Sequence, residues 1–201
     1  ACDLWMGELE LSFRATKDLD VVMVVDAVSD EFISVFWDFI REGKYATHQQ
    51  SQERSNFYRF EDPEHGAHPK QIELLTRNEL ALPGDARFTP IPAGEDLSSL
   101  SAILMDGSYY DYVLSSRTTI NGVPTVPVQC LIPLKAKAYL DLKGRKDAGD
   151  KTVKGDDVKK HRNDVFALAQ TLTPDDRYPL PEELKSDLRS FLESLPVDSD
   201  D

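Results

Sequence analysis

Cysteines and long apolar runs are scarce in this chain of 201 residues. Its two cysteines, Cys2 and Cys130, are too few for a disulfide framework and too far apart for metal-ligand spacing, so we expect reduced thiols. No apolar run approaches the roughly 20 residues that span a bilayer, and no charged segment followed by an apolar one has the form of a signal peptide. We therefore expect a soluble, cytoplasmic protein without a membrane partner.

Basic residues are outnumbered by acidic ones. The chain has 23 Lys or Arg against 36 Asp or Glu, which gives a net charge of −13. Long-range repulsion from phosphates argues against a general nucleic-acid coat, so any nucleic acid has to bind at a local basic patch. The glycine motifs GxxxxGK[ST] and GxGxxG are missing, the four histidines lack metal-ligand spacing, and no serine or cysteine stands in a nucleophile elbow. These absences leave P-loop enzymes, dinucleotide-binding enzymes and hydrolytic triads without support.

The first third of the chain predicts a small sheet with one helix. Residues 21–25 are valine-rich and predict a buried strand, and residues 56–60 and 71–75 predict two strands of a hairpin around a turn with Pro and Gly. Between them, Ser29 can cap a helix that stops at Gly43. Its apolar positions recur at helical spacing and are Phe32, Val35, Phe36, Phe39 and Ile40. The order strand, helix, strand, strand predicts an α/β or α+β fold with a small mixed sheet and flanking helices.

The rest of the chain predicts a helical lobe. Residues 108–116 and 123–128 are expected to be short strands, and residues 129–145, 156–172 and 181–195 are expected to be helices with polar connections. We therefore divide the chain into a core at 1–128 and a C-terminal helical lobe at 129–201. The chain opens at Ala1 in what reads as the middle of a helix, so we expect part of the natural N-terminus to lie upstream.

Three carboxylates carry the first chemical hypothesis. Asp18 and Asp20 are two residues apart at the start of a strand, so their side chains are expected to point the same way. Magnesium prefers carboxylate oxygens and often bridges to substrate phosphates. Glu73 is flanked by Ile72 and Leu74, and beside the aspartates it would complete a cage for two ions. The alternatives are an acidic strand flank without a ligand and, for Glu73 alone, a side chain that faces solvent.

Two cations on predicted helices carry the second hypothesis. Lys135 falls inside the apolar arc of its helix whereas Lys137 falls outside, and Arg162 falls inside the stripe of the next helix. A cation on an apolar face needs an acidic partner, a ligand phosphate, or a route for its end to reach water. From Lys135 to Arg162 there are ten Lys or Arg against five Asp. This patch suits a magnesium nucleotide and an RNA end, and it is equally typical of an exposed lysine-rich helix pair. The apolar arc of the first helix consists of Leu131, Leu134, Ala138 and Leu142, and the apolar stripe of the next consists of Val158, Val165 and Ala169.

Taken together, these residues resemble the polymerase-beta-like nucleotidyltransferase superfamily. The resemblance covers residues 13–20, which read Phe-Arg-Ala-Thr-Lys-Asp-Leu-Asp, and the valine strand, helix and hairpin that follow. Within the superfamily the chain looks like the AbiEii/AbiGii-type nucleotidyltransferases, several of which are toxins of bacterial toxin–antitoxin systems. The C-terminal half contributes two helical segments to the likeness, Leu131 to Lys135 and Lys160 to Asp164.

The resemblance implies a reaction and residues for it. Asp18, Asp20 and Glu73 would be catalytic and would bind two Mg²⁺ ions. The enzyme would transfer a nucleoside monophosphate from an NTP to an RNA end, such as that of a tRNA, or to a protein hydroxyl. Pyrophosphate would leave. An antitoxin protein is the implied partner. The nucleotide-binding residues would be Arg14, Lys17, Lys135, Arg162 and Asp164, with Arg14 and Lys135 on the triphosphate.

The resemblance also implies a Gly-Gly or Gly-Ser pair just before the first helix, where backbone amides meet phosphate. The printed sequence begins at Ala1 without this pair, and we expect it upstream. Two alternatives remain open. One is a catalytically inactive nucleotidyltransferase fold that acts as a binding or regulatory module, and the other is a structural domain whose acidic pair has no chemical role.

Overall fold

The computed structural model describes residues 1–14, 18–22, 30–47, 57–75, 103 and 107–195. The chain forms two compact units. The first, here called the helical unit, combines Ala1–Arg14 with Ala102–Asp201, and the second, the sheet unit, is Ala15–Ser101. This division differs from the predicted boundary after residue 128, because residues 1–14 and 107–128 belong to the same unit as the C-terminal helices.

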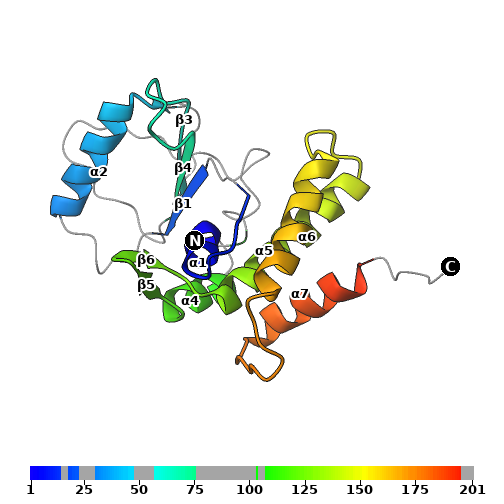
Figure 1. Cartoon of the computed structure of the whole chain (residues 1–201). Coiled ribbons are helices and arrows are strands. Elements are labelled where there is room, and N and C mark those ends of the chain that lie inside the picture. Colours follow the sequence, from blue (N-terminus) through cyan, green and yellow to red (C-terminus); the bar gives the residue numbers. More distant parts are fainter. Residues whose placement is uncertain (15–17, 23–29, 48–56, 76–102, 104–106, 196–201) are drawn as a thin grey trace. The chain divides into compact units, whose positions relative to one another are not determined.

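A four-stranded mixed sheet is the centre of the sheet unit (Figure 1). Its strands are β1 (Asp18–Val22), β2 (Ala46–Thr47), β3 (Phe57–Glu61) and β4 (Gln71–Leu75), in the order β1-β4-β3-β2. β1 pairs with β4 in parallel, and the other pairs are antiparallel. The predicted β3–β4 hairpin and the small mixed sheet are confirmed, so the protein is α+β at this level of description.

Helix α2 (Asp30–Gly43) covers the sheet through aromatic side chains. Phe60 of β3 is buried, and its ring lies edge-on to Phe36 at 5.8 Å and to Trp37 at 5.6 Å between centroids. The prediction that Val35 and Phe39 belong to the core is wrong, because both are exposed and Val35 reaches 63%. Trp37 and Ile40 are buried and Phe36 is half-buried. Ile40 follows Phe36 by four residues and Trp37 by three, which is the spacing of one helix face.

Helix α2 ends at Gly43, as predicted, and packing leaves no room for a side chain at this position. A Cβ atom at this position would lie 2.6 Å from the Tyr45 ring and 2.9 Å from the His68 ring, so a larger residue does not fit. The left-handed backbone that reverses the chain falls on the next residue, Lys44, at a φ of 50°. The predicted N-cap, Ser29, lies outside the described residues.

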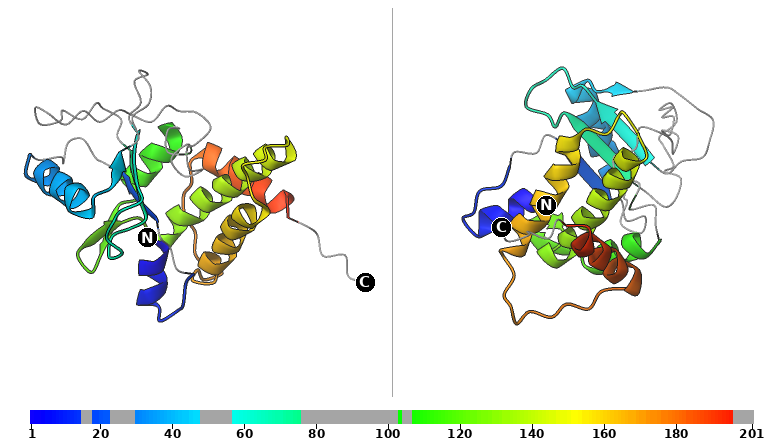
Figure 2. Two further views of the ribbon diagram at one scale, coloured as in Figure 1. Left: turned by 90° about the horizontal axis from the view of Figure 1, so that it is seen from above. Right: turned by 90° about the vertical axis from the view of Figure 1, so that its right-hand side faces the viewer.

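Helix α5 organises the helical unit. Within this unit, α5 packs against α1, α4, α6 and α7, and α6 lies alongside it (Figures 1 and 2). The first helix is tied on by its indole, since Trp5 Nε1 donates a 2.8 Å hydrogen bond to the carbonyl oxygen of Val126. The elements are α1 (Cys2–Glu8), α4 (Gly107–Ser115), β5 (Thr118–Ile120), β6 (Val123–Thr125), α5 (Val128–Asp147), α6 (Gly155–Ala169) and α7 (Glu182–Glu193).

Predictions for this unit are confirmed for the three C-terminal helices and wrong for one strand. Residues 108–116, expected as a strand, form helix α4, whose buried side chains Tyr109, Tyr110 and Val113 have helical rather than alternating spacing. The strand expected at 123–128 is limited to β6, because α5 begins at Val128 directly after Pro127. Among the described helices, none combines the length and apolar character needed to cross a bilayer.

Candidate functional site

The sheet unit places Asp20 beside Glu73. In the parallel register of β1 and β4, Asp20 pairs with Glu73 and Asp18 pairs with Gln71. On the other side of β4, Arg59 of β3 pairs with Glu73 in the antiparallel register. In the sheet, Glu73 is therefore flanked by an acidic residue, Asp20, on one neighbouring strand and by a basic residue, Arg59, on the other.

Glu73 itself is buried, with only 2% of its surface exposed. Its Oε1 accepts a 2.7 Å hydrogen bond from Nε2 of Gln71, two residues earlier on the same strand. The alternative that Glu73 faces solvent is therefore wrong. A buried carboxylate is costly unless hydrogen bonds or cations compensate it, and its oxygens are hard ligands of the kind that Mg²⁺ accepts.

A metal cage is not visible among the described side chains. In that part of the chain, no group of three or more His, Cys, Asp or Glu could hold a metal ion. The side chains of Asp18 and Asp20 are not among those described, so the predicted set of three carboxylates stays a prediction. Lys17, predicted to bind the nucleotide, also lies outside the described residues.

The helical unit brings together three of the predicted residues around one carboxylate. Arg14 donates from Nε to Oδ1 of Asp164 at 2.8 Å and from Nη2 to Oδ2 at 2.6 Å. Nζ of Lys135 lies 3.5 Å from the same Oδ2. Only 3% of the Asp164 side chain is exposed, so two cations share one buried anion. We call these three residues the Asp164 cluster.

The inward position predicted for Lys135 is confirmed, since 16% of its side chain is exposed. Lys137, predicted outside the apolar arc, is 28% exposed and lies 3.3 Å from Oδ2 of Asp187 on α7. Asp187 also accepts a 2.8 Å hydrogen bond from the hydroxyl of Tyr109 on α4. Lys137 therefore links α5 to α7, whereas Lys135 belongs to the Asp164 cluster.

The buried face of helix α6 differs from the predicted one. Its buried residues include Val158 and Val165, as expected, but Ala169 is exposed and Leu168 is buried in its place. Arg162 is half-buried, and its Nη2 lies 3.5 Å from Oδ1 of Asn163. Among the described residues it forms no ion pair with Asp164, whose ion-pair partners are Arg14 and Lys135. The predicted role of Arg162 in nucleotide binding stays a prediction.

His161 was missed by the sequence analysis. It precedes Asp164 by three residues and so lies on the same face of α6. Burial, together with the positive charges of Lys135 and Lys160, lowers the pKa of its imidazole to about 3. Its Nδ1 is buried and has no hydrogen-bond partner within the described part of the chain. The spacing of three from Asp164 was the one available signal.

Cys2 adds a neutral group to the same neighbourhood. Burial raises the pKa of its thiol, although the positive charges of Lys135 and Arg14 oppose that shift. The thiol therefore stays protonated and contributes packing rather than charge, as expected for a buried cysteine.

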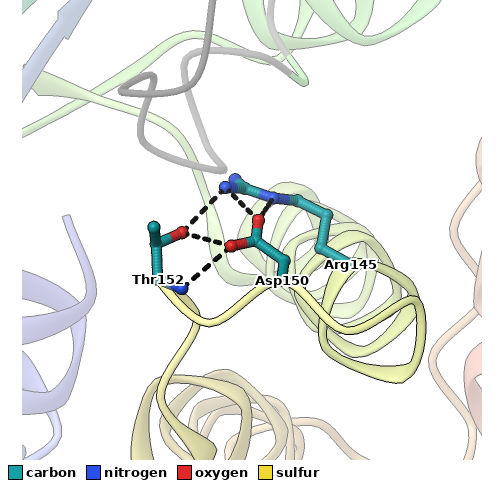
Figure 3. A network of polar contacts seen from close by, with 3 residues as sticks. All are labelled: Arg145, Asp150 and Thr152. Carbon is teal, nitrogen blue, oxygen red and sulfur yellow. Dashed lines mark hydrogen bonds and ion pairs between the residues drawn. The ribbon is translucent and has the colours of Figure 1, made fainter.

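The basic stretch between α5 and α6 is partly neutralised by its own acids. Figure 3 shows Asp150 in the connecting loop, where it accepts from Nε of Arg145 at 2.9 Å and from the backbone N–H and hydroxyl of Thr152 at 2.9 and 2.6 Å. Those hydrogen bonds lower the pKa of Asp150 to about 2. Lys143 likewise pairs with Asp147 at 2.5 Å. Some of the cations counted in this stretch are therefore paired with neighbouring carboxylates.

The fold and these clusters define an α+β protein with a buried sheet carboxylate and a separate buried cation–carboxylate cluster. Comparisons with protein-family models, with curated proteins and with solved structures found no match for this chain.

Proposed function

We propose that this protein is a magnesium-dependent nucleotidyltransferase that transfers a nucleoside monophosphate from an NTP to an RNA end or a protein hydroxyl. The observation that supports this most is the register that pairs Asp20 with Glu73 on adjacent parallel strands. A slip of one residue would separate these positions and reverse the face on which one of them stands.

In this proposal Asp18, Asp20 and Glu73 hold the metal. Their carboxylate oxygens match the ligand preference of Mg²⁺. Bound metal would supply charge neutralisation at the phosphates and at the attacking and leaving oxygens. Glu73 would also accept the proton of the acceptor hydroxyl, a role that suits a carboxylate shielded from bulk water.

The helical unit would contribute recognition of the triphosphate. Arg14 and Lys135 both carry positive charge, and both lie against the carboxylate of Asp164. An arginine fork matches phosphate as well as carboxylate geometry, so a triphosphate can compete with Asp164 for the same donors.

Nucleotide transfer by the full chain tests this proposal. Each of four α-labelled NTPs would be incubated with Mg²⁺, the protein and either total RNA or total protein as acceptor. We expect label on one acceptor class, and we expect Glu73→Gln and Asp20→Asn to reduce the rate by about 100-fold or more, because each removes a negative charge that is proposed to hold Mg²⁺. Glu42→Gln, at an exposed position on α2, is the matched control and should retain full activity.

Two results would reject the proposal. One is the absence of label on every acceptor when Mg²⁺ and all four NTPs are present. The other is transfer that persists unchanged in Glu73→Gln. If transfer is found, growth arrest on expression of the chain, but not of its Glu73→Gln variant, tests the further proposal that it acts as the toxin of a toxin–antitoxin pair.

A catalytically inactive binding module is the second candidate. The observation that favours it is the pairing of Arg14 with Asp164, which already occupies two donors of the guanidinium. This candidate predicts magnesium-dependent binding of an NTP in isothermal titration without transfer to any acceptor.

A further inference from the structure

We infer that the outward side of α2 is a docking surface for a cationic amphipathic helix of a partner protein. This surface, here called the α2 face, consists of two exposed apolar side chains with exposed carboxylates beside them, namely Val35 and Phe39 with Glu31, Asp38 and Glu42. None of these residues has a role in the proposed nucleotide transfer, so the inference does not rest on that proposal.

The apolar part of the α2 face is exposed although its spacing is typical of a packed helix. Val35 and Phe39 are four residues apart and are therefore neighbours on one side of the helix. Val35 is 63% exposed and Phe39 is 36% exposed, whereas Trp37 and Ile40 of the same helix are buried. Removal of apolar surface from water is the main favourable term in protein association. A partner that covers this side of α2 therefore gains binding energy.

The ring of Phe39 is held by its neighbours. Its centroid lies 4.8 Å from that of His68 and 6.4 Å from that of Tyr45. The His68 ring lies in turn 6.2 Å from the ring of exposed His65, in the loop between β3 and β4. Phe39 is therefore ordered before a partner arrives, which reduces the entropic cost of binding.

The charges beside the apolar pair are negative. Glu31 precedes Val35 by four residues and Glu42 follows Phe39 by three, so each carboxylate stands next to one of the apolar side chains. Both glutamates are exposed, and neither has an ion-pair partner in the described part of the chain. The α2 face therefore combines an apolar centre with two carboxylates that a partner can pair.

These charges indicate which partner fits. Carboxylates repel the phosphates of nucleic acid and of an anionic lipid surface. A second copy docked through its own α2 would bring acidic side chains against acidic ones, and the cation Arg41 is already paired with Asp38. A helix with an apolar stripe between lysines or arginines can instead cover the apolar pair and place its cations beside the two glutamates.

The test uses a synthetic helical peptide with leucines along one face and lysines on both sides of them, and a second peptide with glutamate in place of every lysine. Binding to the full chain is measured by isothermal titration, and the contact surface is mapped through the backbone amide signals in NMR. We expect the lysine peptide to bind and to shift the signals of α2, and the glutamate peptide not to bind. Added salt should weaken binding, because ion pairs at a surface are screened.

One pair of variants tests the apolar contact. Val35→Ser should weaken binding of the lysine peptide about 10-fold, as expected when one valine is no longer buried. Leu192→Ser, at a similarly exposed position on α7, is the control and should bind the peptide as the unaltered chain does.

A second pair tests the charges and separates the α2 face from the general acidity of the chain. The double variant Glu31→Gln/Glu42→Gln should weaken binding about 5-fold, as for two exposed ion pairs. Asp156→Asn/Asp157→Asn removes the same charge from exposed positions in the first turn of α6 and should leave the affinity unchanged. All these positions are exposed, so we expect every variant to keep the fold.

Several results would overturn the inference. They are a lysine peptide that does not bind, equal binding of the two peptides, signal shifts that lie outside α2, and equal affinities for the variant and its control in either pair. Sedimentation of the chain alone tests the second copy as occupant. A dimer that Val35→Ser dissociates would show that another copy of this chain covers the α2 face, and would also overturn the inference.

Discussion

Arg14 and Asp164 form a two-point hydrogen-bonded ion pair in which the carboxylate is almost fully buried. The two residues are 150 positions apart in the chain. The pair therefore fastens the end of the N-terminal stretch of the helical unit to α6, and Lys135 on α5 approaches the same carboxylate.

Asp164→Asn should destabilise the helical unit by about 2–4 kcal/mol, because it leaves two cations close together without the charge that compensates them. Urea unfolding followed by helical circular dichroism and by fluorescence of Trp5, which belongs to this unit, measures the change. Asp147→Asn, which removes only the partner of Lys143 at the end of α5, is the control and should leave the unfolding midpoint unchanged. Equal midpoints for the two variants would show that the Asp164 cluster does not stabilise the fold.

Acid should weaken the fold through His161. Above about pH 6.5 the imidazole is neutral in both folded and unfolded chains. Between that pH and about 3, its pKa in the folded protein, the unfolded chain binds a proton that the folded chain does not. Stability therefore falls as the pH falls, by up to about 1.4 kcal/mol per pH unit from this group.

His161→Gln should flatten this pH dependence, since glutamine does not titrate. Urea unfolding at a series of pH values compares it with His65→Gln, a change at an exposed histidine that should keep the original slope. If the slopes of the two variants agree, the imidazole of His161 is not kept neutral by its surroundings.

Tyr109→Phe should cost about 1 kcal/mol of stability, the usual net value of one hydrogen bond. The buried hydroxyl donates to Asp187, and both burial and that hydrogen bond raise the pKa of Tyr109. Thermal unfolding measures the loss. As a control, Tyr178→Phe at an exposed position should not move the melting temperature, and a Tyr109→Phe chain that melts at the original temperature would contradict the prediction.

Asp150→Ala should loosen the loop between α5 and α6. The carboxylate accepts hydrogen bonds from Arg145 and from the backbone and side chain of Thr152, so the variant loses all of them at once (Figure 3). We expect faster hydrogen exchange at the amide of Thr152, measured by NMR or mass spectrometry. Asp156→Ala, at an exposed position in the first turn of α6, should leave that amide unchanged. Unaltered protection in Asp150→Ala would mean that other contacts hold the loop.

Much of the secondary structure could be predicted because periodicity is local. The β3–β4 hairpin and the long C-terminal helices each bury one face, and the spacing of apolar residues reveals that face. The helix at Gly107–Ser115 was not predicted, because its tyrosines favour strands by propensity while their burial follows a helical period.

The site was predictable only in part. The inward direction of Lys135 followed from the apolar arc of its helix, and Glu73 was identified from its place between Ile72 and Leu74 on the second strand of the predicted hairpin. On α6, a buried face predicted from aliphatic residues alone includes Arg162 and does not include His161. The observed buried face differs because it contains a polar side chain, Asp164. That aspartate is buried by partners on two other segments, and no local pattern encodes contacts of such long sequence separation.

The division of the chain has a consequence for how it can change in length. The helical unit is closed only when Ala1–Arg14 returns to the helices across the whole of Ala15–Ser101. The entropic cost of closing such a loop grows only with the logarithm of its length, at about 0.6 kcal/mol for each doubling. Insertions or deletions in the sheet unit therefore add little to the cost of docking α1, so this unit can be resized during evolution while the helical unit keeps its fold.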